Sequence, residues 1–399
     1  MPFMKARAGL AVFAGCALLL AGCAERDEFT DSTLPPITSD QIAAATTTST
    51  IDLAPADQGP RTPTITGDGC ELTPVPATGS ATLTYSIGGS ILELSADATE
   101  ASCVIENVVP PPGEVIWAPG GNSLLIGPAT LRNVFGAFPT GLVDTDTTVR
   151  WSYPDGAYLL SVNDRGRLDR RTAGNARARQ SLYAMDRTTT VTAHPAGEHL
   201  LIGGTARDRT VGIWIANLEG RSARPIVTVP TDGAAITEIS SSSSGDQIGF
   251  VATVGERFEL FIGRLPELTL ARVLDVQTPL AALTQSASGA LAVRVGACAG
   301  RTTTQMYAGG TMVDVSASGA LANRSTSPVG WLDANRLIVI ARDTGCEGSG
   351  DLWAVNVANP NLPQLLVSAV DRVAIRPGPV RATPIGGNLA PNPASVDLA

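Results

Sequence analysis

A repeated unit of strand, small polar turn and returning strand constrains the fold of this chain more than any other feature. The six copies span Trp117–Ile126, Trp151–Leu160, Thr192–Ile202, Ile239–Ile248, Leu283–Val293 and Gly330–Ile340. Their turn residues lie 35, 41, 48, 44 and 46 positions apart, at Gly121, Gly156, Gly197, Gly245, Gly289 and Asn335. A tight turn that recurs with a period of about 44 residues is typical of β-propeller blades. The sequence therefore predicts an all-β chain that folds as a β-propeller.

The number of blades follows from the length of the chain. When the two ends are set aside, roughly 310 residues remain, which corresponds to about seven blades of this period. Six blades have clear turns, so the seventh has to combine Thr82–Cys103 with a strand at Val373–Arg376. A blade built from both ends of the chain leaves no exposed sheet edge, and this favours seven blades. The alternative is six blades, with Cys70–Val109 as an elaboration beside the ring.

The composition agrees with an all-β fold. The chain contains 41 Gly and 28 Pro, and its apolar runs are short and rich in Val, Ile, Leu and Thr. Helical periodicity is nearly absent. The one segment with a trace of it, Asn175–Ala184, is predicted to be a long loop between strands.

The repeat also resembles a known family. The turn Trp151–Gly156 is similar to the Trp-Ser-Pro-Asp-Gly turn of TolB-like (WD40-like) propellers, except that Tyr153 is inserted before the proline. Three later strands resemble the Asp-Ile-Trp strand of the same family: Gly212–Gly220, Glu259–Leu265 and Asp351–Val357. The resemblance covers roughly residues 113 to 375. It implies a propeller that acts as a protein-interaction module in the bacterial envelope.

The first residues predict export and anchoring. Lys5 and Arg7 precede an apolar stretch, Leu10–Leu20, that is too short to span a bilayer and is typical of a secretory signal. The following Leu20-Ala-Gly-Cys23 resembles a bacterial lipobox, which implies cleavage before Cys23 and lipidation of its thiol. We therefore predict a lipoprotein signal peptide at residues 1–22 and a location on the extracytoplasmic face of the membrane. The alternative is an ordinary signal peptide followed by an incidental cysteine.

The rest of the chain divides into three parts. Residues 23–69 are rich in Thr, Pro, Asp and Ala and poor in aromatic side chains, so they predict a disordered, flexible tether. An alternative for part of it, Ile42–Thr50, is a segment that folds when it meets a partner. Residues 70–384 form the predicted propeller, and the Pro/Gly/Asn-rich residues 385–399 predict a loose tail.

The charge limits the classes of partner. The whole chain carries −9, and loss of Lys5 and Arg7 with the signal peptide leaves 26 basic against 37 acidic residues, or −11. A domain this acidic, without basic clusters, is not expected to bind nucleic acid or to dock on anionic lipid by charge. The membrane contact is therefore expected to come from the lipid anchor. The sequence leaves the oligomeric state open.

The cysteines predict two disulfides. Four cysteines remain after Cys16 and Cys23, an even number that is typical of oxidised bridges outside the cytoplasm. Cys298 and Cys346 each follow the second strand of their repeat, and equivalent loops of successive blades are neighbours. We therefore predict the pair Cys298–Cys346, which leaves Cys70 with Cys103. Four free thiols are the alternative.

Candidate reactive residues occupy repeat positions. His194 and His199, the only histidines, lie across a turn, where His194 replaces a turn-capping serine, and no third metal ligand accompanies them. The serine run Ser240–Ser244 also falls in a turn, and the chain has no Gly-x-Ser-x-Gly elbow. Asp144 and Asp146 could hold calcium, but a solvated loop is favoured. The tryptophans are interpreted as wedges between blades, with carbohydrate stacking as the alternative.

These features predict a binding protein. We expect no catalytic residues, no metal and no cofactor, and a propeller that binds an envelope protein or glycan as a non-catalytic scaffold. Two alternatives stay open: a propeller enzyme (glycan lyase, glycosidase or lactonase) and a small-ligand sensor that partners a membrane protein. Carboxylates gathered with His or Arg at the mouth of the central funnel would favour the enzyme, because propellers host many chemistries.

Overall fold

The computed structural model describes residues 60–67, 69–76, 79–106, 115–127, 130–143, 146–175, 177–317, 319–379, 382, 384–385, 389 and 392–398. The predicted signal peptide, Cys23 and most of the predicted tether lie outside these residues. The description below therefore concerns the unit that runs from residue 52 to the end of the chain.

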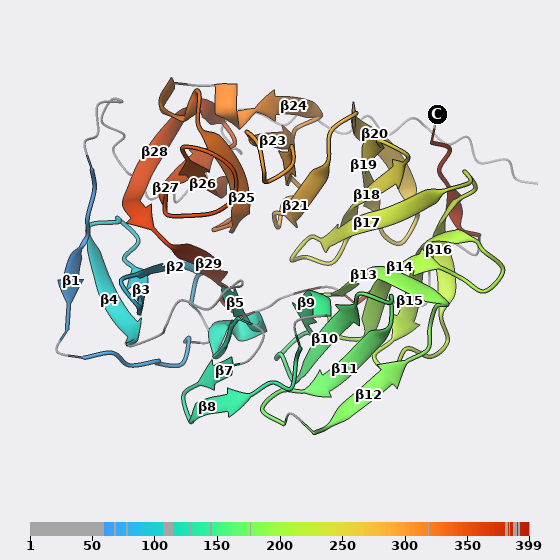
Figure 1. Ribbon diagram of the computed structural model, residues 1–399, viewed down its shortest axis with the longest axis horizontal. Helices are drawn as coiled ribbons and strands as arrows, with labels where there is room; N and C mark the ends of the chain where they lie inside the picture. Colours follow the sequence, from blue (N-terminus) through green and yellow to red (C-terminus); the bar gives the residue numbers. More distant parts are fainter. Residues whose placement is uncertain are drawn as a thin grey trace, which may run out of the picture. The chain divides into compact units, whose positions relative to one another are not determined.

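The described chain forms a seven-bladed β-propeller (Figure 1). Blades 2 and 3 contain β5 (Val115–Trp117), β6 (Ser123–Ile126), β7 (Thr130–Asn133), β8 (Gly136–Pro139), β9 (Asp146–Trp151), β10 (Tyr158–Asn163), β11 (Leu168–Thr172) and β12 (Arg179–Leu182). Blades 4 and 5 contain β13 (Arg187–Ala193), β14 (His199–Thr205), β15 (Val211–Asn217), β16 (Arg224–Val229), β17 (Ala234–Ser241), β18 (Gln247–Val254), β19 (Arg257–Arg264) and β20 (Thr269–Val276). Blades 6 and 7 contain β21 (Leu280–Gln285), β22 (Leu291–Val295), β23 (Thr303–Ala308), β24 (Thr311–Asp314), β25 (Ser325–Trp331), β26 (Arg336–Arg342), β27 (Gly350–Asn356) and β28 (Asn359–Val370).

Blade 1 joins the two ends of the propeller. Its strand order is β29 (Arg372–Arg376), β2 (Thr82–Ile87), β3 (Ser90–Leu94), β4 (Glu100–Ile105) and β1 (Thr64–Thr66). The C-terminal strand β29 pairs antiparallel with β2, with Leu83 opposite Ile375. The prediction of a seventh blade made from both chain ends is therefore confirmed, and the six-bladed alternative is wrong.

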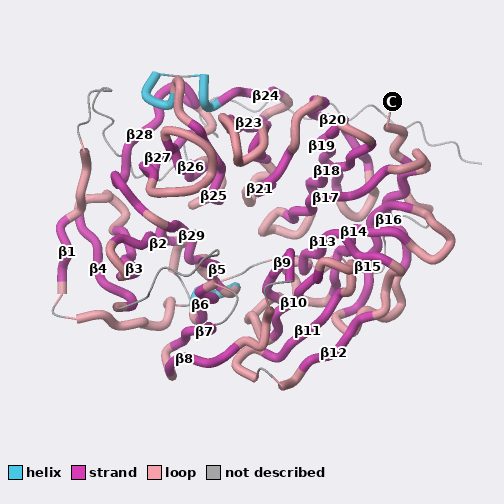
Figure 2. The backbone as a smooth tube through the Cα atoms, viewed as in Figure 1, coloured by secondary structure: helices cyan, strands magenta, loops and turns pink. Residues whose placement is uncertain are grey.

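Strands and loops account for almost all of the described chain (Figure 2). The helical turns there are three short 3-10 segments, η2 (Pro119–Gly121), η3 (Val315–Ala317) and η4 (Gly319–Leu321). Among the described residues, none of these turns has the length and apolar character that a membrane-crossing helix needs.

The repeated turns join the first and second strands of their blades with one hydrogen-bonding pattern. In five turns the N–H of the turn glycine donates to the carbonyl of the residue at which the turn begins. These glycines are Gly121, Gly156, Gly197, Gly245 and Gly289. All five have φ between +69° and +84°, a region that glycine adopts without strain. At Gly197 a Cβ would also lie 2.7 Å from the carbonyl oxygen of Tyr153 in the preceding blade. Glycine is therefore required there both for the turn and for the contact between blades.

The core lies between neighbouring blades, because each strand has a side chain period of two. In β26, Leu337, Val339 and Ala341 pack in a cluster with Ala292 of blade 6. The alternate residues Ile338 and Ile340 pack in another cluster with Leu83 of blade 1. Strands of this kind are buried on both faces and read as continuous apolar runs. The propeller is consequently held together by interfaces that connect every blade to the next.

Arg376 closes the ring at its junction between blades 1 and 2. Its side chain is buried, and Nη1 lies 2.6 Å from Oε2 of Glu93. Nε donates to the carbonyl of Gly121 at 2.9 Å, Nη2 donates to the carbonyl of Thr73, and the guanidinium lies 4.7 Å from the ring centroid of Trp117. One C-terminal side chain thus binds both the N-terminal part of its own blade and the first turn of the next blade.

Three segments differ from the sequence-based expectation. The predicted tether ended at residue 69, but β1 adds a fifth strand to blade 1 by parallel pairing with Glu100–Ser102 of β4. The predicted loose tail carries a short strand, β30 (Ala394–Ser395), that pairs with β16 of blade 4. Four apolar side chains of this tail are buried in the blade 4 cluster and explain why it packs: Ile385, Leu389, Val396 and Leu398.

The third difference is the predicted loop at Asn175–Ala184, which contains the outer strand β12 of blade 3. This strand reads Arg-Gln-Ser-Leu and has no apolar alternation. Asp169 of β11 holds it instead, because the fully buried carboxylate receives hydrogen bonds from Arg179 Nη2 at 2.5 Å and Ser181 Oγ at 2.7 Å. Burial raises the pKa of Asp169, but these two hydrogen bonds, together with the charges of Arg179 and Arg167, outweigh burial and hold that pKa below its ordinary value.

Candidate functional site

Both predicted disulfides are present, and they fix two different parts of the propeller. Cys298 and Cys346, with Cα atoms 4.9 Å apart, join the loops after β22 and β26 in blades 6 and 7. Cys70 and Cys103, with Cα atoms 4.4 Å apart, join the segment between β1 and β2 to β4. Both predicted pairings are confirmed, and the Cys298–Cys346 bridge forms because equivalent loops of successive blades are neighbours.

A segment that we call the strap, made up of residues 61–67, 69 and 70, is held at both ends. At its start, Arg61 and Ser368 of β28 exchange hydrogen bonds: the Arg61 N–H donates to Ser368 Oγ at 3.1 Å, and the Ser368 N–H donates to the Arg61 carbonyl at 2.9 Å. In its middle, β1 pairs with β4. At its end, Cys70 is bound to Cys103. The strap therefore runs from blade 7 to blade 1 as a fixed element.

A cavity of about 440 Å³ lies between the strap and blade 1. The strap contributes Thr62, Pro63, Ile65, Gly67, Gly69 and Cys70, and the blade contributes Tyr85, Ile87, Ser90, Leu92, Cys103 and Glu106. Tyr85, Leu92 and Cys103 stand opposite one another on adjacent strands, so they form one face of the blade. The volume falls within the range of small-ligand sites, roughly 300 to 1,000 Å³.

The residues that line the cavity can bind a ligand by apolar contact and by hydrogen bonds. Burial raises the pKa of Tyr85 to about 12, so its hydroxyl is neutral at physiological pH. Glu106 supplies the one charged side chain among the lining residues, and it is exposed. The sulfur atoms of Cys70 and Cys103 are close to this carboxylate, but both are consumed in the disulfide and are not available as metal ligands.

The strap also exposes a strand edge beside the cavity. β1 is the outermost strand of blade 1, and β4 is its partner on one side. All three residues of β1 are exposed, and Ile65 is 62% exposed although its side chain lines the cavity. An exposed apolar side chain beside a cavity is placed to contact a ligand that binds there. The sequence could not reveal this site, because residues 60–69 have the composition of the tether.

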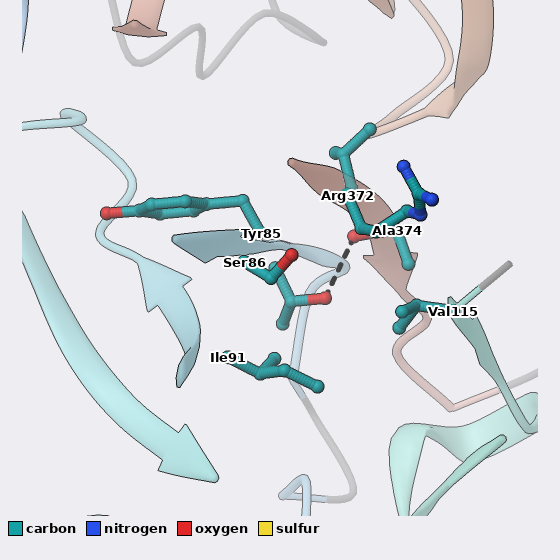
Figure 3. A pocket seen from close by; sticks show the side chains of 8 residues that line it. Tyr85, Ser86, Ile91, Val115, Arg372 and Ala374 are labelled. Atoms are coloured by element: carbon teal, nitrogen blue, oxygen red, sulfur yellow. Dashed lines mark hydrogen bonds between the residues drawn. The ribbon is translucent and has the colours of Figure 1, made fainter. Parts of the chain in front are cut away.

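A second opening, between blades 1 and 2, is too narrow to admit a water molecule. Figure 3 shows its walls, with Tyr85 and Ile91 on one side and Val115 and Arg372 on the other. The dashed line in Figure 3 is the 3.0 Å hydrogen bond that Thr84 Oγ1 donates to the carbonyl of Ala374. Thr84 Oγ1 also accepts a hydrogen bond from Trp117 Nε1 at 2.7 Å. This crevice therefore belongs to the packing between the blades.

Two of the tryptophans interpreted as wedges, Trp117 and Trp151, lie at such junctions. Trp117 of blade 2 is bonded to Thr84 of blade 1, as described above. Trp151 of blade 3 donates from Nε1 to the carbonyl of Ile116 in blade 2 at 3.2 Å. Both side chains are buried. The wedge interpretation is confirmed for these two residues.

Of the two acidic residues considered for calcium, Asp144 lies outside the described residues. Asp146 Oδ2 accepts a hydrogen bond from the N–H of Val143 at 3.0 Å. The same oxygen lies 3.7 Å from Nη2 of the buried Arg171. Asp146 therefore stabilises the start of blade 3.

Within the serine run, Ser240 and Ser241 end strand β17, and Ser242–Ser244 stabilise the turn that follows. Ser242 Oγ accepts a hydrogen bond from the N–H of Gln247 at 3.1 Å, and Ser244 Oγ donates to the carbonyl of Ala287 in the next blade at 3.3 Å. The structural interpretation of this run is confirmed.

His194 links the turns of blades 4 and 5. Its side chain is fully buried, and Nδ1 accepts a hydrogen bond from the N–H of Ala196 at 3.3 Å. Nε2 lies 2.7 Å from the carbonyl oxygen of Gly245, so it carries the proton and donates. The predicted turn-capping role is confirmed, and it extends to the neighbouring blade. Burial lowers the pKa of His194 below its ordinary value.

This burial predicts a pH-dependent stability. The folded-state pKa of His194 is below the unfolded value of about 6.5. The stability that this residue gives the folded state is therefore fully present above about pH 6.5 and is lost as the pH falls towards the folded pKa. The free energy of unfolding should fall by up to about 1.4 kcal/mol per pH unit in that window. Urea unfolding from pH 7.5 to pH 5 measures this slope. His194→Gln should remove it, and His199→Gln, which changes the only other histidine, should keep it. Equal slopes in all three proteins would contradict the assignment.

Comparison with known proteins finds similar solved structures at low sequence identity. No protein-family model and no curated protein matches the chain. Among solved structures, it is similar to a putative TolB from Agrobacterium tumefaciens, with 12% identity over 56% of this chain and 82% of that one and a TM-score of 0.41. It is also similar to TolB from Acinetobacter baumannii, with 13% identity over 76% of this chain and 68% of that one and a TM-score of 0.40. It is also similar to a putative 6-phosphogluconolactonase from Bacteroides fragilis (14%, 76% and 99%, 0.47). The fold by itself assigns no activity, because one fold can carry many different chemistries.

Proposed function

We propose that this protein is a lipid-anchored, extracytoplasmic propeller that binds an envelope protein or glycan without catalysing a reaction. The lipobox-like Leu20-Ala-Gly-Cys23 supports the lipid anchor, and the TolB-like turn motif supports the binding role. The anchor residue Cys23 lies outside the described residues. The observation that carries it is the strap cavity, which combines apolar walls, a neutral hydroxyl and an exposed strand edge.

The geometry favours an extended segment of an envelope protein as the ligand. A peptide in β conformation can add to the free edge of β1, where main-chain hydrogen bonds supply affinity. Its alternate side chains would then point to the cavity, where Ile65, Ile87 and Leu92 offer apolar contact. Specificity would come from the polar groups at the rim, Ser90 and Glu106. A glycan would instead have to use mainly these polar groups.

A photo-crosslinking experiment in intact cells tests this site. A photoreactive amino acid at Ile65 is expected to capture a discrete envelope component, because this side chain lies beside the cavity. Leu362 on β28 is the matched control, since its exposed fraction is 61% against 62% for Ile65 and it does not line the cavity. Equal capture at both positions, or hydrolase or lyase turnover by the purified protein, would contradict the proposal. Cys23→Ala should release the protein from the membrane fraction.

A further inference from the structure

Two arginines occupy equivalent places in blades 6 and 7. Arg294 lies near the end of β22 and Arg342 ends β26, so both are on the second strand of their blade. Each is followed four residues later by a cysteine, in Arg294-Val-Gly-Ala-Cys298 and Arg342-Asp-Thr-Gly-Cys346. The disulfide between these cysteines holds the two loops together. The repeat therefore places two positive charges at the same level of adjacent blades.

Hydrogen bonds between the blades fix the strand ends that carry these arginines. Arg294 stands opposite Thr304 of β23, and Arg342 stands opposite Ser325 of β25. Thr302, just before β23, donates from its N–H to Ser325 Oγ at 3.3 Å. The arginine-bearing ends of β22 and β26 are consequently connected through their partner strands as well as through the disulfide.

A third arginine, Arg372, lies next to the same loop of blade 7. Arg342 Nε donates to the carbonyl of Gly348 at 2.9 Å. The following residue, Ser349, donates from Oγ to Asp371 Oδ1 at 2.7 Å, and Asp371 directly precedes Arg372. Burial, together with the charges of Arg372 and Arg294, lowers the pKa of Arg342. The charges of Arg294 and Arg372 therefore act on Arg342.

The carboxylates of this region have other partners. Arg324 Nη1 lies 2.6 Å from Asp351 Oδ2, and its Nη2 lies 3.8 Å from Asp343 Oδ1. Asp371 accepts the hydrogen bond from Ser349. Glu347 is exposed. Among the described residues, no carboxylate oxygen lies within the 4.0 Å ion-pair distance of the Arg342 guanidinium, although Arg342 is only 8% exposed. A buried cation without an acidic partner is unfavourable unless another anion accompanies it.

We propose that Arg342, with Arg294 and Arg372, forms an anion-binding site where blades 6, 7 and 1 meet, and that its ligand is a small oxyanion such as phosphate or sulfate. The planar guanidinium fork matches the oxygen atoms of such groups. Arg294 and Arg372 are half-buried and have contacts of their own, so they contribute charge, while Arg342 provides the buried donor. This site is separate from the strap cavity and does not rest on the proposed function.

Titration of the purified protein with inorganic phosphate or sulfate, at ionic strength held constant with sodium chloride, tests the site. Each oxyanion is expected to raise the unfolding temperature in a saturable manner, because a ligand that binds the folded state stabilises it. Arg342→Gln should weaken the apparent affinity at least about tenfold, as expected for loss of a charged hydrogen-bonding group. Arg336→Gln is the control, since this arginine is about a third exposed and is paired with Asp333.

A second variant separates binding from folding. Arg342→Lys keeps the charge but loses the planar fork, so it should fold and should retain partial affinity. An unchanged response in Arg342→Gln, or a wild-type response to phosphate and sulfate no greater than that to chloride, would overturn the proposal.

Discussion

Replacing Arg376 with methionine should lower the free energy of unfolding by about 3 to 5 kcal/mol, the range for breaking a buried ion pair on one side. The substitution removes the cationic partner of Glu93 at 2.6 Å and the arginine donor to the carbonyl of Gly121. It also removes the cation that lies over Trp117. The loss should be large because all of these contacts join the C-terminal strand to the N-terminal part of the ring.

Chemical unfolding followed by tryptophan fluorescence measures this effect, and the chain offers a matched control. Arg336 forms an equally short ion pair with Asp333 at 2.6 Å, but both side chains are more than a third exposed. Arg336→Met should therefore change the free energy of unfolding by less than about 1 kcal/mol. If Arg376→Met and Arg336→Met lower the free energy of unfolding by the same amount, Arg376 is not the residue that closes the ring.

Removal of the Cys298–Cys346 disulfide should lower the free energy of unfolding by a comparable amount. The bridge spans 48 positions, and the chain-entropy model assigns about 4 kcal/mol to a loop of this size. The double variant Cys298→Ala/Cys346→Ala should therefore unfold at a clearly lower denaturant concentration than the oxidised wild type.

The second disulfide provides the comparison for this prediction. Cys70–Cys103 spans 33 positions. Because the loop-closure entropy grows slowly with loop length, removal of this bridge should lower the free energy of unfolding by nearly the same amount. Only the Cys70→Ala/Cys103→Ala variant should also loosen the strap and reduce crosslinking from Ile65. Unfolding of Cys298→Ala/Cys346→Ala that matches the oxidised wild type would show that blades 6 and 7 do not need their covalent link.

The sequence alone determined the features that depend on local chemistry. Turn glycines such as Gly156 and Gly197 are visible because each turn needs a positive φ, and their spacing counts the blades. The pairing of Cys298 with Cys346 follows from the same repeat, because equivalent loops of neighbouring blades meet. The structural roles of His194 and of the serine run could likewise be inferred from their place in a turn.

Tertiary structure decided what depends on contacts between distant segments. β1 resembles the tether in composition and becomes a strand only because β4 and the Cys70–Cys103 bridge hold it. β12 lacks apolar alternation and is held by the buried charge of Asp169, while β30 lies in a Pro/Gly/Asn-rich tail and pairs with β16. The strap cavity and the environment of Arg342 arise in the same way. Their residues are far apart in the chain, and no periodic pattern in the sequence indicates which ones meet.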